Sequence, residues 1–203
     1  MQHYQASAPA QTRDGYPVRR GHVMPGPADT YIGYGRNWAN VSNTPFREYK
    51  HYVHEGGIST PLVVHWPRGF QAKDELRSEP AHLVDLMATC LDVANVEYPK
   101  KLGNNPLTPL EGLSLEPVFQ GQQLDRELIF FEHEGNRALR IGDWKLVAKG
   151  RHGQNDVKWE LYNIGNDRSE MHDLSAIEPE RFNRMQNLWK EKAAAVLALP
   201  WPD

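Results

Sequence analysis

Four short apolar runs, each separated from the next by a few polar residues, constrain the fold of this chain more than any other feature. They span residues 128–131, 138–141, 144–148 and 157–162. Runs of this length are typical of β-strands, and Gly142-Asp143 predicts a tight turn between the middle two. Because a parallel connection needs a dozen or more residues, strands this close in sequence are expected to form an antiparallel sheet.

The last of these runs alternates Val157, Trp159 and Leu161 with Lys158, Glu160 and Tyr162, which predicts a sheet with one covered face. A helix is expected near residues 179–198, opened either by a Ser175/Glu178 capping box or by Pro179 directly. Its apolar face, which should cover the sheet, consists of Phe182, Met185, Trp189 and Val196. Sheet and helix together predict a small α+β subdomain over residues 115–203.

Residues 1–114 have a different character. Residues 1–45 are rich in Gly, Pro, Tyr, Asn and Arg and predict a long loop, or at the very start a floppy end. Residues 62–66 predict a buried strand, and residues 78–94 a helix capped by Ser78. The apolar face expected for that helix comprises Leu83, Leu86, Met87, Cys90, Leu91 and Ala94. A strand followed by a helix indicates part of an α/β layered domain.

Composition excludes several classes of protein. The net charge of -3 argues against a nucleic-acid partner. No apolar run approaches the roughly 18 residues needed to span a bilayer, and residues 1–15 lack the apolar core of a signal peptide. The single cysteine, Cys90, rules out an intramolecular disulfide and is expected to be a small core residue.

The densest group of polar residues lies between 43 and 61. Lys50 precedes a Glu55-Gly56-Gly57 turn, and such paired glycines let the backbone approach a ligand or another chain segment. A lysine there can place a compact charge on an oxyanion, although spacing alone favours a solvated surface side chain. His51 and His54 are too weakly patterned to assign to a metal, and a structural role is favoured for each.

The stretch from Asn43 to Pro67 resembles type I sulfatases, the arylsulfatase family. Its lysine, four further residues, Glu-Gly-Gly and a segment ending in Trp-Pro follow that family's order. Three more stretches agree in sequence order: residues 82–89, 110–115, and 132–146 continuing through 160–174. The resemblance extends over about residues 28–200.

The resemblance implies an alkaline-phosphatase-like α/β fold with a smaller C-terminal domain, and hydrolysis of sulfate esters such as aryl or carbohydrate sulfates. Family members use a formylglycine nucleophile and a calcium ion, with cations on the sulfate oxygens. Of these parts only Lys50 transfers to this chain, as a catalytic cation that binds the sulfate. His133 follows a strand and is a second substrate-binding candidate at the cleft rim, or else a histidine that satisfies a strand end.

The other family residues are not found in this chain. Cys90 is followed by Leu91-Asp92-Val93-Ala94, which is no formylglycine motif. The calcium ligands are expected outside this chain, in an N-terminal catalytic half of the same protein. We therefore expect the isolated chain to be inactive and to bind no cofactor alone, and a homo-oligomer is a further hypothesis.

Two other functions stay open at this stage. One is a phosphodiesterase or phosphonate hydrolase of the same superfamily, and the other is a non-catalytic binding or scaffold domain. The family suggests a periplasmic or secreted location. The sequence leaves the particular sulfate ester undetermined.

Overall fold

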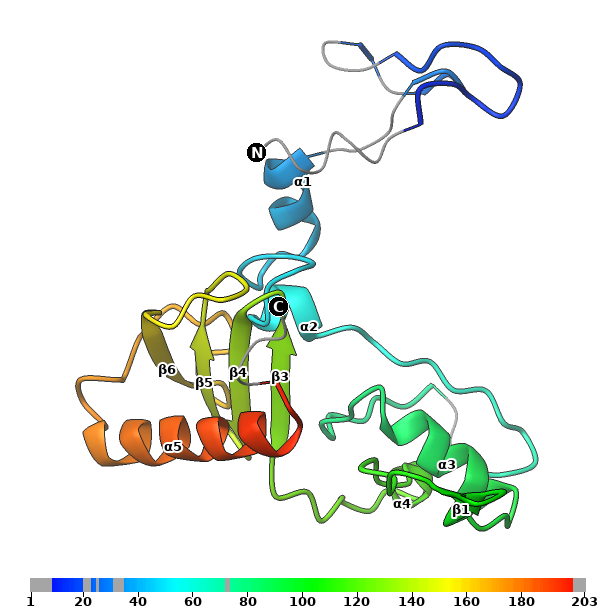
Figure 1. Cartoon of the computed structure of the whole chain (residues 1–203), viewed down its shortest axis with the longest axis vertical. Coiled ribbons are helices and arrows are strands. Elements are labelled where there is room, and N and C mark those ends of the chain that lie inside the picture. Colours follow the sequence, from blue (N-terminus) through cyan, green and yellow to red (C-terminus); the bar gives the residue numbers. More distant parts are fainter. Residues whose placement is uncertain (1–8, 20–22, 25, 31–34, 72–73, 199–203) are drawn as a thin grey trace. The chain divides into compact units, whose positions relative to one another are not determined.

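The computed structural model of the chain describes residues 9–19, 23–24, 26–30, 35–71 and 74–198 (Figure 1). The chain forms two compact units, Met1–Thr44 and Pro45–Asp203. The domain boundary predicted at residue 115 falls inside the second unit and stays a prediction.

The first unit, where it is described, is mostly loop, as predicted. An ion pair of 2.7 Å joins Arg19 Nε to Asp29 Oδ2, and residue 19 forms an isolated bridge with Thr30. The helix α1, Gly35–Ser42, forms where the sequence predicted loop. Residues 1–8, 20–22, 25 and 31–34 of the predicted loop lie outside the described residues.

The second unit contains the predicted antiparallel sheet, in the order β3-β4-β5-β6. Its strands are β3 (Ile129–His133), β4 (Asn136–Ile141), β5 (Trp144–Ala148) and β6 (Trp159–Asn163). Gly142 has φ 55° in the predicted β4–β5 turn. The β3–β4 turn uses Glu134 and Gly135 at φ 54° and 88°, the two positive angles that a tight two-residue hairpin requires.

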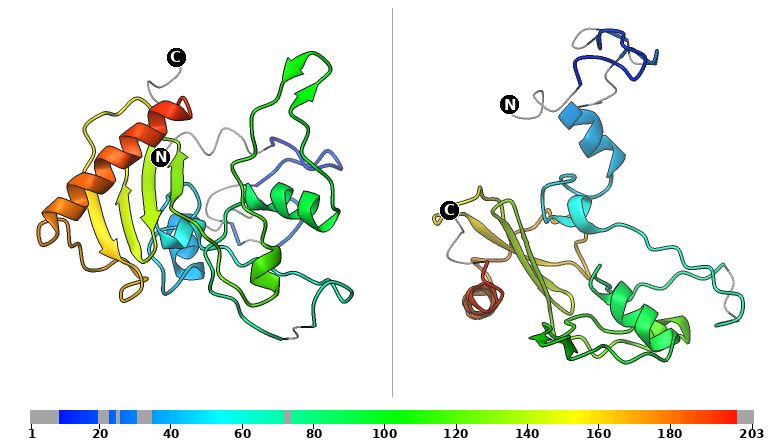
Figure 2. Two further views of the ribbon diagram at one scale, coloured as in Figure 1. Left: turned by 90° about the horizontal axis from the view of Figure 1, so that it is seen from below. Right: turned by 45° about the vertical axis from the view of Figure 1, so that its right-hand side comes forward.

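Helix α5, Pro179–Ala195, lies across one face of the sheet (Figure 2). Glu178 is its N-cap without a side-chain hydrogen bond, so Pro179 opens the helix and the capping box does not form. Its buried side chains pack on β4, β5 and β6 in a core of Leu139, Leu146, Leu161, Met185, Trp189 and Ala193. Val196 lies beyond the end of the helix and is exposed.

The opposite face of the sheet is also covered, which corrects the expectation of one covered face. Ala138, Val147 and Tyr162 point to this side and are buried with Val53 and Ile164. The cover comes from the segment that includes α2, Glu55–Ile58, which Figure 2 shows on the side of the sheet away from α5. Local periodicity could not predict it, because the covering segment lies far away in sequence.

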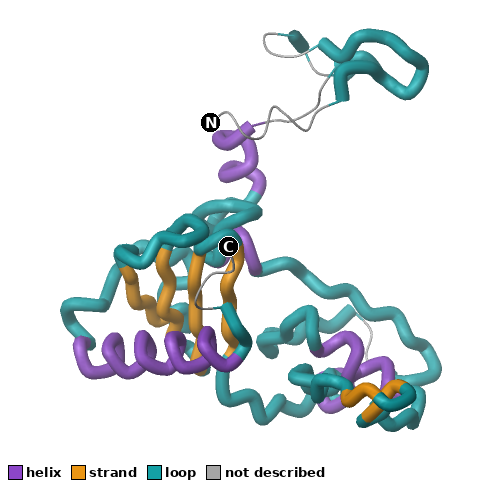
Figure 3. The backbone as a smooth tube through the Cα atoms, viewed as in Figure 1, coloured by secondary structure: helices purple, strands orange, loops and turns teal. Residues whose placement is uncertain are grey.

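Loop dominates residues 59–128 (Figure 3). The short elements there are α3 (Asp85–Val93), the hairpin of β1 (Lys101–Leu102) and β2 (Asn105–Pro106), and α4 (Glu116–Phe119). The strand predicted at residues 62–66 is absent, and Val63 is 88% exposed. A buried strand needs neighbouring strands for its backbone groups, and the described part of the chain provides none for that segment.

Helix α3 also departs from expectation, since it begins at Asp85 and buries its polar side. Asp85 and Thr89 are buried, whereas the predicted apolar face is largely exposed. Cys90 is exposed with it, so the prediction of a core cysteine is wrong for this chain. Among the described residues, no helix has the length and apolar character to cross a membrane.

Candidate functional site

The loop from residue 47 to 58 carries Lys50 to the edge of an open pocket of about 550 Å³. Lys50 is exposed, which suits both a ligand contact and a solvated surface lysine. His51, His82 and His133 line the same pocket, together with Phe131 of β3. The pocket therefore combines one cation, three imidazoles, the carboxylate of Glu132 and an apolar wall.

Two glycines fix the shape of the loop behind Lys50. A Cβ atom on Gly56 would lie 2.3 Å from the carbonyl oxygen of Arg47, and one on Gly57 would lie 1.9 Å from that of Tyr52. Such distances exclude any side chain at either position. The Gly56 N–H donates to the Arg47 carbonyl at 2.9 Å. The glycine pair thus lets the backbone approach another chain segment, one of the two roles that its sequence suggested.

A buried ion cluster fastens this loop to the sheet. Lys145 of β5 is 0% exposed, and its Nζ lies 2.8 Å from Glu55 Oε1 and 2.9 Å from Glu170 Oε1. The Glu55 N–H donates to Glu170 Oε2 at 2.9 Å, and Arg168 Nη2 lies 3.3 Å from Glu55 Oε2. Burial, the largest single effect, would raise the pKa of Glu55, but the charge and hydrogen bond of Lys145 together with the charges of Arg168 and Arg140 outweigh it, so that pKa is lowered. Two cations thus balance two carboxylates at the base of the loop.

A second set of contacts joins the same loop to β6. Arg47 donates from Nη1 to the Tyr162 hydroxyl at 3.0 Å and to the carbonyl of Glu170. The Tyr162 hydroxyl donates in turn to Glu160 Oε2 at 3.1 Å. His54 is fully buried with Nε2 3.5 Å from the same oxygen, and this contact is the largest of several, with those of Tyr162, Lys158 and Arg47, that lower the pKa of Glu160 to about 2 against the effect of burial. His54 therefore lies inside the protein, in keeping with the structural role favoured for it.

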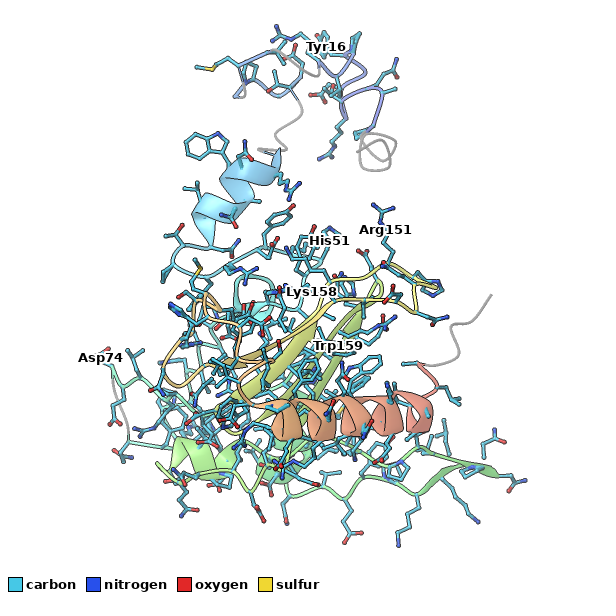
Figure 4. The ribbon with its side chains drawn as sticks, turned by 90° about the vertical axis from the view of Figure 1, so that its left-hand side faces the viewer. Tyr16, His51, Asp74, Arg151, Lys158 and Trp159 are labelled. Atoms are coloured by element: carbon cyan, nitrogen blue, oxygen red, sulfur yellow. The ribbon has the colours of Figure 1, made fainter. Side chains whose placement is uncertain are left out.

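His51 and His133 meet at the rim of the pocket. Their rings stack with centroids 6.0 Å apart, and His51 Nδ1 lies 2.9 Å from Glu134 Oε2. Asn136 is buried and donates from Nδ2 to the carbonyl oxygens of both histidines, at 2.9 Å and 3.1 Å. The backbone at His51 has φ 88°, a conformation that non-glycine residues rarely adopt. Figure 4 labels the His51 side chain.

Two of the other sequence motifs, residues 82–89 and 110–115, bind each other, and of their residues only His82 lines this pocket. Asp85 accepts from the Leu113 N–H at 3.0 Å and from Arg126 Nη2 at 2.6 Å. Thr89 Oγ1 accepts from the Leu115 N–H at 2.9 Å. The aspartate and threonine of α3 thus hold the loop that carries residues 110–115, and their part in the fold is structural.

Lys50 and His133, the two site residues proposed from sequence, line one pocket although 83 positions separate them (133 − 50). Sequence reasoning left His51 unassigned and missed Glu134 and Lys145. A positive charge at one position of the otherwise apolar run 144–148 was the available signal for Lys145. No local pattern could pair His51 with Glu134, since the contact depends on how the loop folds on the sheet.

The described residues do not form a calcium site. Calcium takes six to eight oxygen ligands. The one described set of three neighbouring metal-ligating side chains, His51, His133 and Glu134, offers mainly nitrogen. Among the described residues, this cluster therefore does not fit the calcium ion that the family resemblance implies.

Comparison with known proteins gives concordant results. The family model for the C-terminal part of N-sulphoglucosamine sulphohydrolase matches residues 47–196. The uncharacterized sulfatase PB10D8.02c of Schizosaccharomyces pombe is 27% identical over 86% of this chain and 32% of its own length. Arylsulfatase K of Danio rerio is 31% identical over 65% of this chain and 25% of its own.

Solved structures give a weaker comparison. The structure of BT4656 in complex with its substrate D-glucosamine-2-N,6-O-disulfate aligns at a TM-score of 0.42 and 23% identity, covering 57% of this chain and 24% of that one. The chain spans about a third or less of the length of the curated relatives that it matches.

Proposed function

This chain belongs to the N-sulphoglucosamine sulphohydrolase C-terminal family of sulfatases, and from that premise we propose that it supplies Lys50 to the sulfate pocket of a larger sulfate-ester hydrolase. The observation that carries the proposal is the exposed Lys50 on a loop with a buried anchor. A site that stabilises charge needs a cation held in place before the reaction begins. Lys145, Glu55 and the two glycines hold that loop without using Lys50 itself.

The chemical role follows from the charge of the lysine. An ammonium group next to a sulfate oxygen favours the negative charge that develops as the ester bond breaks. One charge-assisted contact of this kind contributes about 1.5–3 kcal/mol. His133, on the same pocket, would contact the part of the substrate that carries the sulfate and so form the cleft rim.

The remaining machinery is proposed to lie in an N-terminal catalytic half of the same protein, on an alkaline-phosphatase-like fold. It would comprise the formylglycine nucleophile and the calcium ion with its acidic ligands. The sequence after Cys90 does not match the formylglycine motif, so we expect the isolated chain to be inactive. A periplasmic or secreted location is part of the same proposal, by analogy with the family.

Sulfate esters are favoured over the alternatives considered above. The relatives described are sulfatases, which speaks against a phosphodiesterase, a phosphonate hydrolase or a scaffold domain as the parent protein. The pocket mixes polar and apolar walls and would accept an aryl or a carbohydrate sulfate.

The test uses the complete reading frame that contains this chain. The complete protein should hydrolyse a chromogenic aryl sulfate or a sulfated glucosamine, whereas the purified 203-residue chain should not. Lys50→Ala in the complete protein should lower kcat/KM by about 10- to 100-fold with the fold intact. Lys158→Ala is the matched control, because that lysine is also exposed but does not line the pocket.

Unchanged kinetics in the Lys50 variant would remove this lysine from the site while leaving the family assignment in place. Turnover of phosphodiesters in preference to every sulfate ester tested would instead overturn the proposed reaction. Circular dichroism of each variant shows whether a loss of activity reflects a loss of folding.

A further inference from the structure

We propose that His51, His133 and Glu134 form a binding site for a divalent transition-metal ion such as Zn²⁺. Each residue offers one ligand atom, and the three atoms all lie within 4.8 Å of one another. Two imidazoles and one carboxylate are a donor set that zinc accepts, and they leave a coordination position open. The site shares His133 with the substrate pocket proposed above, but its geometry uses neither Lys50 nor a substrate, so zinc binding can be tested apart from the sulfatase reaction.

The distances suit ligands that surround one ion. Bonds of about 2.0–2.2 Å to one zinc ion place neighbouring ligand atoms about 3 Å apart. His51 Nδ1 and Glu134 Oε2 are already 2.9 Å apart. His133 Nε2 lies 3.9 Å from Glu134 Oε1, and its side chain is 56% exposed, so rotation of the ring can bring the third ligand closer. Only side-chain movement is therefore needed.

The backbone around the three ligands is held in advance. Asn136 ties the carbonyl oxygens of His51 and His133 together through a single buried amide. Glu134 is fixed in the two-residue β3–β4 turn at φ 54°. His51 adopts φ 88°, and strained backbone of this kind clusters at functional sites. A site held by such supporting contacts loses less conformational freedom when the ion binds.

The open coordination position would adjoin the pocket that Lys50 lines. A water molecule or an anionic oxygen of a ligand is the group that such a position takes. A bound ion would therefore add positive charge to a pocket whose lining carries Lys50 and the carboxylate of Glu132. This gives the pocket a preference for anionic ligands through a contact that Lys50 does not make.

The experiment is a calorimetric titration of Zn²⁺ into the full 203-residue chain after treatment with a chelator. We expect one ion per chain and a rise in melting temperature, because a ligand that binds only the folded state stabilises it. Co²⁺ in place of zinc should give the visible absorption of a cobalt centre with nitrogen ligands. Ca²⁺ should bind at least ten-fold more weakly than zinc.

His133→Ala should weaken zinc binding by at least about ten-fold, since loss even of an outer-shell partner has an effect of that size. This side chain is exposed, so its removal should not unfold the protein, and Glu134→Gln tests the carboxylate with little change in shape. His172→Ala is the matched control, because His172 is another exposed histidine beside a carboxylate, Asp167, at 3.4 Å.

The proposal is overturned if the folded chain, verified by circular dichroism, binds no stoichiometric zinc. It is equally overturned if His133→Ala and Glu134→Gln bind zinc as tightly as the unaltered chain. Weakening by His172→Ala to the same degree as by His133→Ala would show binding by scattered surface histidines and would also refute it.

Discussion

Helices α5 and α3 are both amphipathic, yet the chain buries opposite sides of them. Helix α5 packs Met185 and Trp189 into the core beneath the sheet. Helix α3 instead buries Asp85 and Thr89, while its apolar side is largely exposed. The sheet and α5 therefore enclose an apolar core, whereas the buried contacts of α3 at Asp85 and Thr89 are polar.

This difference indicates which part of the chain needs another protein segment to cover its apolar side chains. An exposed apolar helix face and the exposed apolar run at residues 62–64 are costly to leave in water. The sheet does not leave comparable apolar surface in water, because α5 covers one face and the loop of residues 47–58 covers the other. We infer that the loop carrying Lys50 draws its rigidity from the self-sufficient region.

The largest expected effect comes from breaking the anchor between that loop and the sheet. Lys145→Ala leaves the buried carboxylates of Glu55 and Glu170 without their shared cation. Removing one partner of a buried ion pair lowers the free energy of unfolding by about 3–5 kcal/mol. Denaturant unfolding measures this loss, with the exposed Lys158→Ala as control. Equal stability of the two variants would contradict the anchor.

A matched pair of methionines tests the comparison of the helices directly. Met185 of α5 is 1% exposed and Met87 of α3 is 56% exposed. Met185→Ala should lower the free energy of unfolding by about 2–5 kcal/mol through loss of burial and the cavity that remains. Met87→Ala should change it by less than about 0.5 kcal/mol. Similar losses in both variants would mean that the face of α3 is covered in solution.

Acid should weaken the loop anchor before it weakens the apolar core. The pKa values of Glu55 and Glu160 are lower in the folded chain than the ordinary 4.5, for Glu160 about 2. A lowered folded pKa means that the unfolded chain binds protons first, so the stabilisation is present above about pH 4.5 and is lost as the pH falls toward 2. Unfolding free energies measured from pH 6 to 2.5 should fall, and Glu160→Gln should show a shallower fall. A flat profile would refute the claim.

A substitution on the exposed surface of α3 is expected to have the smallest effect, because it should leave the free energy of unfolding unchanged. Slow amide exchange is expected in β3–β6 and α5, and fast exchange at residues 60–84.

If the exposed face mediates the homo-oligomer proposed above, light scattering should show a concentration-dependent mass that Leu86→Glu abolishes. A monomer with uniformly slow exchange would show that α3 needs no partner.

Sequence analysis predicted the C-terminal region well because its signals are local. Alternating side chains, the Gly142 turn and the Met185–Trp189 spacing each depend on residues a few positions apart. The strand at residues 62–66 and the buried face of α3 were predicted incorrectly. Both predictions assumed an apolar partner that the described residues do not provide.

The sequence by itself determined the four strands, the helix that covers them, the family and the place of Lys50 in its motif. Only the tertiary structure brought Lys145 of β5 to Glu55 and Glu134 to His51, across 90 and 83 positions respectively. Local sequence patterns reflect the backbone preferences of the residues and the periodicity with which their side chains are buried. Both act over a few neighbouring residues. Contacts between charged groups distant in sequence arise only when the loop packs on the sheet. For Lys145 and Glu55 that packing also excludes water, which strengthens their attraction.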